Sequence, residues 1–373
     1  MTANVKLTAL EDAFLARLPE ASGDWRAELK AHLEEKGLPH RRVEEWKWTD
    51  LKAALSRLDA GPGELVLDAS READATTQFG EKGPRAVMPR LAAALGGDIA
   101  IYRLTSDRPS LMLDFTAKSG AVHKTVVIEV EAGTKADLHE IYRVDGAGFA
   151  NLSLLIRLGE GASLARTIEQ VKAEEGVLVV TSGVELAPEA RFTQVTLGFG
   201  ARLARLETHV THPGEGAQVS LNGAYVLGES LHLDQTTLVD HTGPHGVTRE
   251  LFKGAASGRA RGVFQGKIAV QRPAQKTDAE MQHRGMLLTE GAEIDAKPEL
   301  EIYADDVVCA HGNALGTIDE DALFYMRQRG LSEAQARAVL TESFLAEPLG
   351  QIAGEARAED FAEKLRARLR ELA

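Results

Sequence analysis

A cysteine and a histidine two residues apart are the side chains of this 373-residue chain that are best suited to bind a metal or to react. Cys309 and His311 lie within the stretch 302–312, which reads IYADDVVCAHG. Residues two apart on a β-strand project from the same face, so a thiolate and an imidazole there could meet one metal ion. Cys309 is the only cysteine, which excludes an intrachain disulfide and a four-cysteine cluster built by this chain alone. Two ligands leave a metal site incomplete, so the remaining ligands would have to come from outside.

Two other interpretations of this pair need no metal. A buried free cysteine beside a hydrogen-bonded histidine is the more common arrangement for an isolated pair. A nucleophilic cysteine activated by histidine is less favoured, because neighbours on one strand face seldom give in-line proton transfer. The chain also lacks a phosphate-binding loop, a zinc-protease helix motif and a nucleophile elbow. We therefore predict no catalytic residue.

Carboxylates and other histidines offer weaker candidates. Asp305 and Asp306 resemble the acidic pairs of polysaccharide-active β-helix enzymes, but adjacent strand residues point to opposite faces unless a bulge intervenes. That enzymatic alternative also expects many aromatic residues and secretion, whereas aromatics are only 5% of this chain. Four further histidines could bind metal, although histidines in turns are usually just polar residues: His209, His212, His241 and His245.

The N-terminal region, residues 1–98, is predicted to be mainly helical. Apolar residues recur at a spacing of four on two amphipathic helices: Leu10, Phe14 and Leu18, then Trp25, Leu29 and Leu33. Trp46 and Trp48 could form an aromatic ligand platform, but we favour an anchor that holds these helices on the body. Residues 60–85 are rich in Gly, Asp and Thr and are expected to form loops before another helix near 86–95.

The central region, residues 99–317, changes to an alternating pattern typical of β-strands. Turns of similar composition end at residues 162, 190 and 217, which gives steps of 28 and 27 residues. Short strands at nearly constant spacing favour a β-helix, a solenoid in which each coil buries its inner face against the next. A two-sheet sandwich is the alternative, since it shares the alternation but requires no fixed period.

Helical periodicity returns in the C-terminal region, residues 318–373. Ser332 and Gln335 have the spacing of a capping box at the start of one helix, which we expect to break at Pro348. A last charged helix is predicted over 355–371.

The formal net charge of −13 disfavours nucleic acid as a partner, because no basic run is long enough to overcome it. The start of the chain does not resemble a signal peptide, and no stretch approaches the roughly 20 apolar residues that cross a bilayer. We expect no membrane association and a cytoplasmic location.

Several stretches closely resemble the SufB and SufD family of the SUF system for iron–sulfur cluster assembly. The resemblance is dense between residues about 240 and 350 and extends to the N-terminal EEWKWTDL at 44–51. The short chain and its single cysteine favour the SufD branch. The matching stretches are LFKG at 251–254, RARGVFQGKI at 259–268, AQKTDA at 274–279, AEIDAKPELEIYADDV at 292–307, and ALFYMRQRG at 322–330, together with Cys309 and His311–Gly312.

This resemblance implies a right-handed parallel β-helix core flanked by helical regions, and a non-enzymatic scaffold. It implies that the core pairs with a SufB core and that one SufC ATPase docks on the C-terminal helices. His311, with Cys309 beside it, would face SufB and help to form a transient, nascent iron–sulfur cluster. Self-pairing of the isolated chain into a homodimer is compatible with these expectations, as is a stand-alone metal-binding module. The resemblance leaves flavin binding open, and no dinucleotide fingerprint in the sequence supports it.

Overall fold

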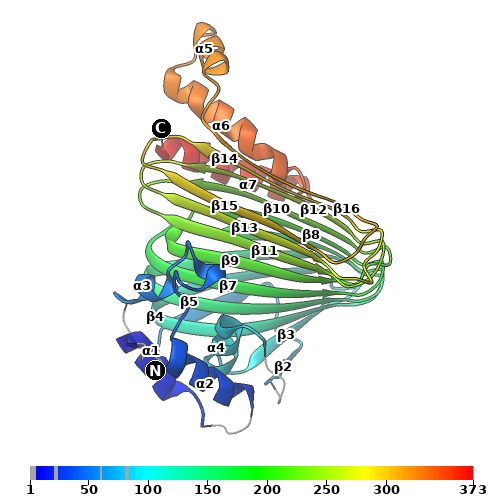
Figure 1. The fold of residues 1–373 in the computed structure, drawn as a ribbon. Coiled ribbons are helices and arrows are strands. Elements are labelled where there is room, and N and C mark those ends of the chain that lie inside the picture. The colour runs from blue at the N-terminus through cyan, green and yellow to red at the C-terminus, as the bar shows by residue number, and fades with distance from the viewer. Residues whose placement is uncertain (1–5, 21–23, 59–60, 80–83, 373) are drawn as a thin grey trace.

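A parallel β-solenoid of about eight turns forms the body of the protein, with helices at both ends of the chain (Figure 1). The computed structural model describes residues 6–20, 24–58, 61–79 and 84–372, of which strands account for 49% and helices for 23% of the structure. The prediction of a solenoid rather than a sandwich is confirmed.

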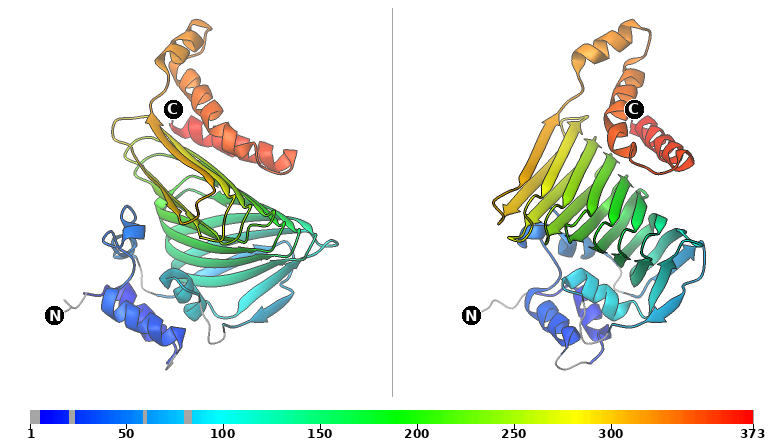
Figure 2. Two further views of the ribbon diagram at one scale, coloured as in Figure 1. Left: turned by 45° about the vertical axis from the view of Figure 1, so that its right-hand side comes forward. Right: turned by 90° about the vertical axis from the view of Figure 1, so that its right-hand side faces the viewer.

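Two stacks of parallel strands form the two faces of the solenoid, and two long strands join them at the first coils (Figure 2). The long strands are β4 (Ser110–Val130) and β5 (Lys135–Leu158). One face contains β7 (Ala173–Leu186), β9 (Ala201–His212), β11 (His232–His241), β13 (Arg261–Val270) and β15 (Glu293–Ile302). The other contains β6 (Ser163–Gln170), β8 (Arg191–Gly198), β10 (Gln218–Leu227), β12 (Val247–Ala256), β14 (Asp278–Leu287) and β16 (Val308–Gly316).

The repeat found in the sequence corresponds to the coil length. Ser163 aligns with Arg191 and Arg191 with Gln218, which are the predicted steps of 28 and 27 residues. At the turns, the backbone of one coil bonds to the next: the N–H of Gly161 donates to the carbonyl of Pro188 at 3.0 Å. Gly161 has a φ of 65°, a left-handed conformation that glycine adopts without steric cost. Turn chemistry and coil stacking therefore specify the same register.

The N-terminal region covers the first coils. Its helices are α1 (Ala9–Arg17), α2 (Trp25–Lys36), the short 3-10 turn η1 (Glu44–Trp46), α3 (Leu51–Leu55) and α4 (Val87–Leu95). Phe14 and Leu29 are fully buried in a cluster that also contains Phe149 of β5 and Val177 of β7. The two predicted amphipathic helices therefore bury their apolar faces against the solenoid.

The expectation of loops over residues 60–85 was wrong in part, and residues 60 and 80–83 of this range lie outside the described residues. Two strands lie there: β1 (Glu64–Ala69), which pairs antiparallel with β4, and β2 (Ala75–Thr77), which pairs with β3 (Ile99–Leu104). Every second residue of β1 (Leu65, Leu67 and Ala69) is half-buried against the core, but this apolar alternation extends over only six residues. Its pairing with a strand about 50 residues further along is a non-local interaction that local composition does not reveal.

Three helices complete the chain: α5 (Glu320–Gln328), α6 (Glu333–Leu349) and α7 (Glu355–Leu372). The predicted capping box of Ser332 and Gln335 begins α6, and this helix continues one residue past Pro348 before it ends. Leu345 and Phe361 pack against the outer face of β8 and β10, so α6 and α7 are fixed to the body. By contrast, α5 extends away from it (Figure 1). Among the described residues, none of the helices has the length and apolarity needed to span a bilayer.

Candidate functional site at the open end of the solenoid

The solenoid ends differently at its two extremities. At the first coil, the free edge of β4 is paired with β1 and β3. At the last coil, β15 and β16 each have a strand neighbour on one side, and no further strand of the described chain covers them (Figure 2). We call this extremity the open end. Unpaired strand edges present backbone donors and acceptors that readily pair with another chain.

Large apolar side chains are exposed at the open end. Val308 is 71% exposed and Leu315 47% exposed on β16, while Ile302 and Tyr303 are 43% and 55% exposed at the end of β15. Monomeric proteins seldom leave grouped apolar side chains in water, and such patches commonly mark binding surfaces. The open end therefore has the composition of an interface.

Cys309, His311 and Asn313 occupy the inward-facing register of β16, and we call these three residues the β16 row. They align with Ala279, Met281 and His283 of β14, which are at most 1% exposed inside the solenoid. The row continues this interior, but no later coil covers it, so His311 and Asn313 are exposed and Cys309 is half-buried. The two residues singled out by their spacing therefore share one face at the mouth of the solenoid.

The chemistry of the β16 row is incomplete within one chain. Burial raises the pKa of the Cys309 thiol above its ordinary value, so the thiol holds its proton at neutral pH unless a cation approaches. Within the described part of the chain, no three His, Cys, Asp or Glu side chains converge in a way that could hold a metal ion. One soft ligand and one imidazole can contribute to a metal–sulfur site, but a second molecule must supply the rest.

The acidic pair lies in the turn between β15 and β16 rather than within a strand. Both Asp305 and Asp306 are exposed. Asp306 forms an ion pair with Lys276, and its backbone N–H donates to the side chain of Gln275 at 2.9 Å. These contacts give Asp306 a turn-stabilising role, and the two carboxylates do not form a convergent pair.

The four other histidines do not form one site. His212 and His241 are buried inside the solenoid with their rings stacked 4.3 Å apart, and burial lowers their pKa values to about 4 and about 3. His209 lies on the outer face of β9, and His245 occupies a turn with a φ of 61°. They are therefore distributed between the interior, the outer face and a turn.

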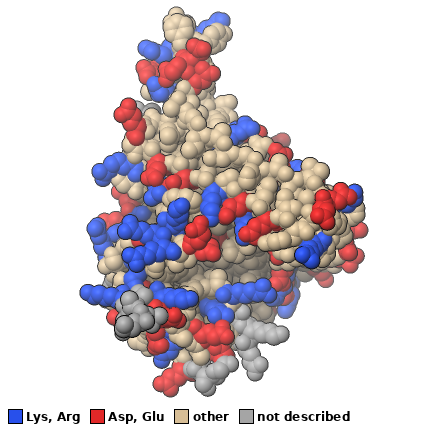
Figure 3. Space-filling view, viewed as in Figure 1, with Lys and Arg blue, Asp and Glu red and all other residues tan. Residues whose placement is uncertain are grey.

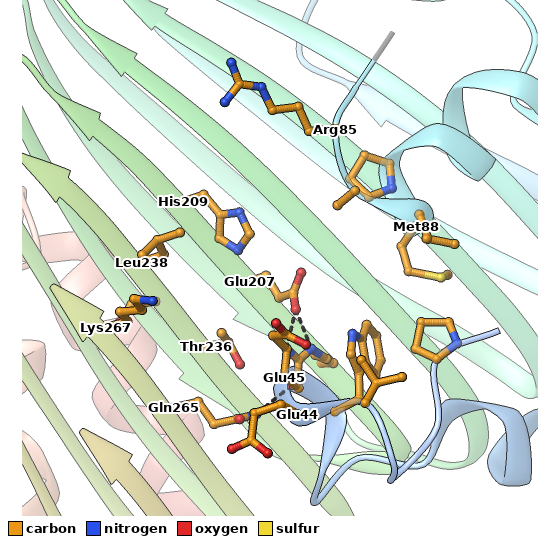
Figure 4. Close-up of a pocket in the computed structure, with 18 of the residues that line it drawn as sticks. Glu44, Glu45, Arg85, Met88, Glu207, His209, Thr236, Leu238, Gln265 and Lys267 are labelled. Atoms are coloured by element: carbon orange, nitrogen blue, oxygen red, sulfur yellow. Dashed lines mark hydrogen bonds and ion pairs between the residues drawn. The ribbon is translucent and has the colours of Figure 1, made fainter. Parts of the chain in front are cut away.

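A cavity of about 820 Å³ separates the N-terminal region from the outer face of the solenoid (Figure 4). Sequence analysis missed it. Its floor includes Glu207, His209 and Lys267, and its wall includes Trp46 and Met88. Positively charged side chains gather on this side of the molecule (Figure 3).

Charged groups that line this cavity are largely paired with one another. Lys267 contacts Glu301 at 2.6 Å, and Lys297 contacts Glu44 at 2.7 Å. In the sequence, the only indication of this cavity is the alternation of charged residues along what becomes the outer face of β9.

Beneath this cavity lies a buried charged cluster, the Arg205 clamp, formed by Trp46, Thr49, Arg205, Asp234 and Gln265. The Arg205 guanidinium lies 4.1 Å from the Trp46 ring and 2.5 Å from Asp234, and Thr49 donates its hydroxyl to Asp234 at 2.5 Å. Gln265 also donates to Asp234, at 3.1 Å. The anchor interpretation of the Trp46 and Trp48 pair is thus confirmed for Trp46, because Trp46 and Thr49 dock the N-terminal segment onto two strands of the solenoid. Trp48 is half-buried, and its ring is contacted by Lys47 of the same segment.

Comparison with known proteins assigns the sequence to one family. Residues 114–344 match the family model described as SUF system FeS cluster assembly, SufBD core domain. A SufBD family protein of Mycobacterium tuberculosis is 28% identical over 345 residues, which cover 85% of each chain.

Other matches are shorter. A SufBD family protein of Synechocystis is 31% identical over 204 residues, which are 55% of this chain and 45% of that relative. The iron–sulfur cluster assembly protein SufD of Escherichia coli is 35% identical over 162 residues, 43% of this chain and 38% of that protein. This chain thus spans less than half the length of these two relatives. The chain belongs to the SufBD family of iron–sulfur cluster assembly proteins.

Proposed function

We propose that this protein is a SufD-type scaffold subunit which pairs with SufB through its open end. The observation that carries this proposal is the combination of two unpaired edge strands, exposed apolar side chains and the β16 row at one extremity. The single cysteine supports the SufD branch, and so do relatives named SufD in Escherichia coli and Plasmodium falciparum. On this proposal the protein performs no catalysis itself and works in the cytoplasm.

The cluster is cargo in this scheme, and His311 and Cys309 supply part of its transient attachment. Thiolate and imidazole are both ligands that iron–sulfur clusters accept. The thiol of Cys309 is protonated in the free chain, so an approaching iron would displace its proton and gain a thiolate ligand. A site shared between two subunits can be dismantled by separating them, which suits a scaffold that must release what it builds.

The helical region from residue 318 onward is proposed to dock the ATPase SufC. Phe324 and Tyr325 of α5 are 64% and 58% exposed, and Val339 of α6 is 44% exposed. Because α6 and α7 are packed on β8 and β10, a movement imposed on these helices would be transmitted to the solenoid. ATP hydrolysis by SufC would then act on the interface at the open end.

Self-association is the second candidate, since the same unpaired edges of β15 and β16 could pair with a second copy of this chain. A stand-alone homodimeric metal module would bind iron stably without any partner. The mass of the isolated chain, measured by light scattering with and without SufB, separates these arrangements.

Substitution of His311 by Ala tests the proposed function. We expect the complex with SufB and SufC to co-purify anaerobically as it does for the unaltered protein, with iron and acid-labile sulfide reduced at least about fivefold. His209→Ala is the matched control, because His209 lies on the outer face beside the cavity and should leave both contents unchanged. Unchanged iron and sulfide in the His311→Ala complex would contradict the assignment.

A further inference from the structure

A buried hydrogen-bonded chain connects the interior of the solenoid to the third residue of the β16 row. The hydroxyl of Tyr225 lies 3.0 Å from Nε2 of His283, and Nδ1 of His283 lies 2.8 Å from Oδ1 of Asn313. Tyr225 and His283 are 1% and 0% exposed, whereas Asn313 is exposed at the open end. The chain thus runs from the core to the mouth of the solenoid.

The direction of each hydrogen bond follows from the burial of its donors. Among the described residues His283 is the hydrogen-bond partner of the Tyr225 hydroxyl, so this buried proton is satisfied by donating to Nε2. Burial lowers the pKa of His283 to about 4, so the neutral ring carries one proton, and that proton is on Nδ1. Nδ1 therefore donates to Oδ1 of Asn313. With its oxygen held inward, the Asn313 amide directs its N–H groups away from His283, toward the open end.

The surroundings of the chain keep it in this geometry. The ring of Phe264 stacks on that of His283 with centroids 5.0 Å apart and planes 5° apart. Glycines make room for Tyr225: a Cβ atom at Gly254 would lie 1.8 Å from its ring, and one at Gly262 would lie 2.6 Å from it. The tyrosine and the histidine cannot turn away without moving these neighbours, so the Asn313 amide is oriented by the core.

Asn313 also lies beside the proposed ligand. Alternate residues on one strand face are about 6.6 Å apart, so the Asn313 amide and the His311 imidazole flank a common space at the mouth of the solenoid. A sulfur atom bound to a metal at His311 would lie within hydrogen-bonding reach of the amide. Hydrogen bonds to cluster sulfurs raise the reduction potential because they stabilise the added negative charge.

We propose that Asn313 is a third assembly residue whose amide N–H groups donate to sulfur of the cluster held at His311, with Tyr225 and His283 as positioning residues. This inference rests on the proposed function. It differs from a purely structural role, in which Asn313 would only satisfy the buried His283 and pin β16 to β14.

The test compares variants in the anaerobic complex with SufB and SufC. Asn313→Asp keeps an oxygen for His283 but removes the N–H donors, Asn313→Ala removes both, and Tyr225→Phe removes only the first link. His209→Ala is the control, because His209 is a polar side chain on the outer face beside the cavity and away from the open end. Iron and sulfide content, the cluster midpoint potential and the affinity for SufB are measured for each, with circular dichroism as the check on folding.

For Asn313→Asp and Asn313→Ala we expect unchanged affinity for SufB, cluster yield reduced about threefold to tenfold, and a more negative potential in the remaining cluster. Tyr225→Phe should lower the cluster yield and the potential in the same direction but by less, and His209→Ala should match the unaltered protein. Wild-type yield and potential in either Asn313 variant would overturn the inference, as would equal losses in His209→Ala.

Failure of this inference and failure of the proposed function give different results. If His311→Ala abolishes the cluster while the Asn313 variants retain it, only the role of Asn313 is refuted. If His311→Ala retains the cluster, the proposed function itself is refuted.

Discussion

The two ends of the solenoid differ in how completely their strands are covered. At the closed end, added strands pair with β4, and helices α1, α2 and α4 bury apolar side chains such as Phe14 and Leu29. At the open end, β15 and β16 remain unpaired on one side, and Val308 is mostly exposed. Every solenoid has two terminal coils whose strand edges lack a neighbour unless something covers them. Because only one end is covered here, the other offers edges to which a partner can add its own strands.

Polar side chains also differ between the covered and the open parts of the solenoid, since they are buried and paired in the first and exposed in the second. In the Arg205 clamp the charges of Arg205 and Asp234 are buried and fully engaged, and they hold the N-terminal segment in place. In the β16 row, His311 is exposed, and no group of three potential metal ligands converges there within the described chain. Buried charge pairs are costly to break, whereas exposed side chains can be exchanged at little cost in stability. Substitutions at the two places should therefore have opposite consequences.

The largest effect on stability is expected from Asp234→Ala at the Arg205 clamp. The substitution leaves the Arg205 charge buried with one carboxylate fewer and removes the acceptor of Thr49 and Gln265. We expect the free energy of unfolding to fall by about 3–5 kcal/mol, as measured by urea denaturation. A loss below about 1 kcal/mol would show that the clamp does not dominate docking of the N-terminal segment.

An intermediate, pH-dependent effect is expected from Glu250→Gln. Glu250 lies in the same inward register as His311, two coils deeper, and burial raises its pKa from 4.5 to about 8. The folded protein therefore holds this proton more tightly than the unfolded chain. The resulting stability is complete below about pH 4.5 and is lost as the pH rises to about 8.

Because glutamine stays neutral, Glu250→Gln should be more stable than the unaltered protein by roughly 3 kcal/mol at pH 7 and by less than about 1 kcal/mol at pH 5. Urea denaturation at the two pH values measures the difference. An equal difference at both values would mean that Glu250 is not held protonated inside the solenoid.

The smallest effect on stability is expected from Val308→Ser at the open end. Val308 is 71% exposed, so its loss should change the free energy of unfolding by less than about 0.5 kcal/mol. The affinity for SufB alone should nevertheless fall about tenfold, because the substitution removes apolar area from the proposed interface. Val339→Ser on α6 is the control for SufB binding. A large loss of stability with normal SufB binding would contradict the view that Val308 serves binding rather than stability.

Much of this organisation can be predicted from the sequence, because the signals lie in residues close together in the chain. Turns ending at residues 162, 190 and 217 set the coil length, and the capping box at Ser332 marks the start of α6. Cys309 and His311 were placed on one face by a spacing of two. Each of these signals depends on residues close together in the chain.

What was missed depends on contacts between distant segments. The Arg205 clamp joins Thr49 to Asp234 across 185 residues, and the link from Tyr225 to His283 spans 58. Strand β1 has only a short apolar alternation, and it pairs with the distant strand β4. No local composition marks such partners, because they are brought together only when the coils stack.

Hydrogen–deuterium exchange of the backbone amides, with and without SufB, tests the central claim most directly. We predict that SufB protects β15 and β16, residues 293–302 and 308–316, while exchange in α1 and α2 is unchanged. Protection of the N-terminal helices with none in β15 and β16 would contradict the assignment of the open end as the assembly surface.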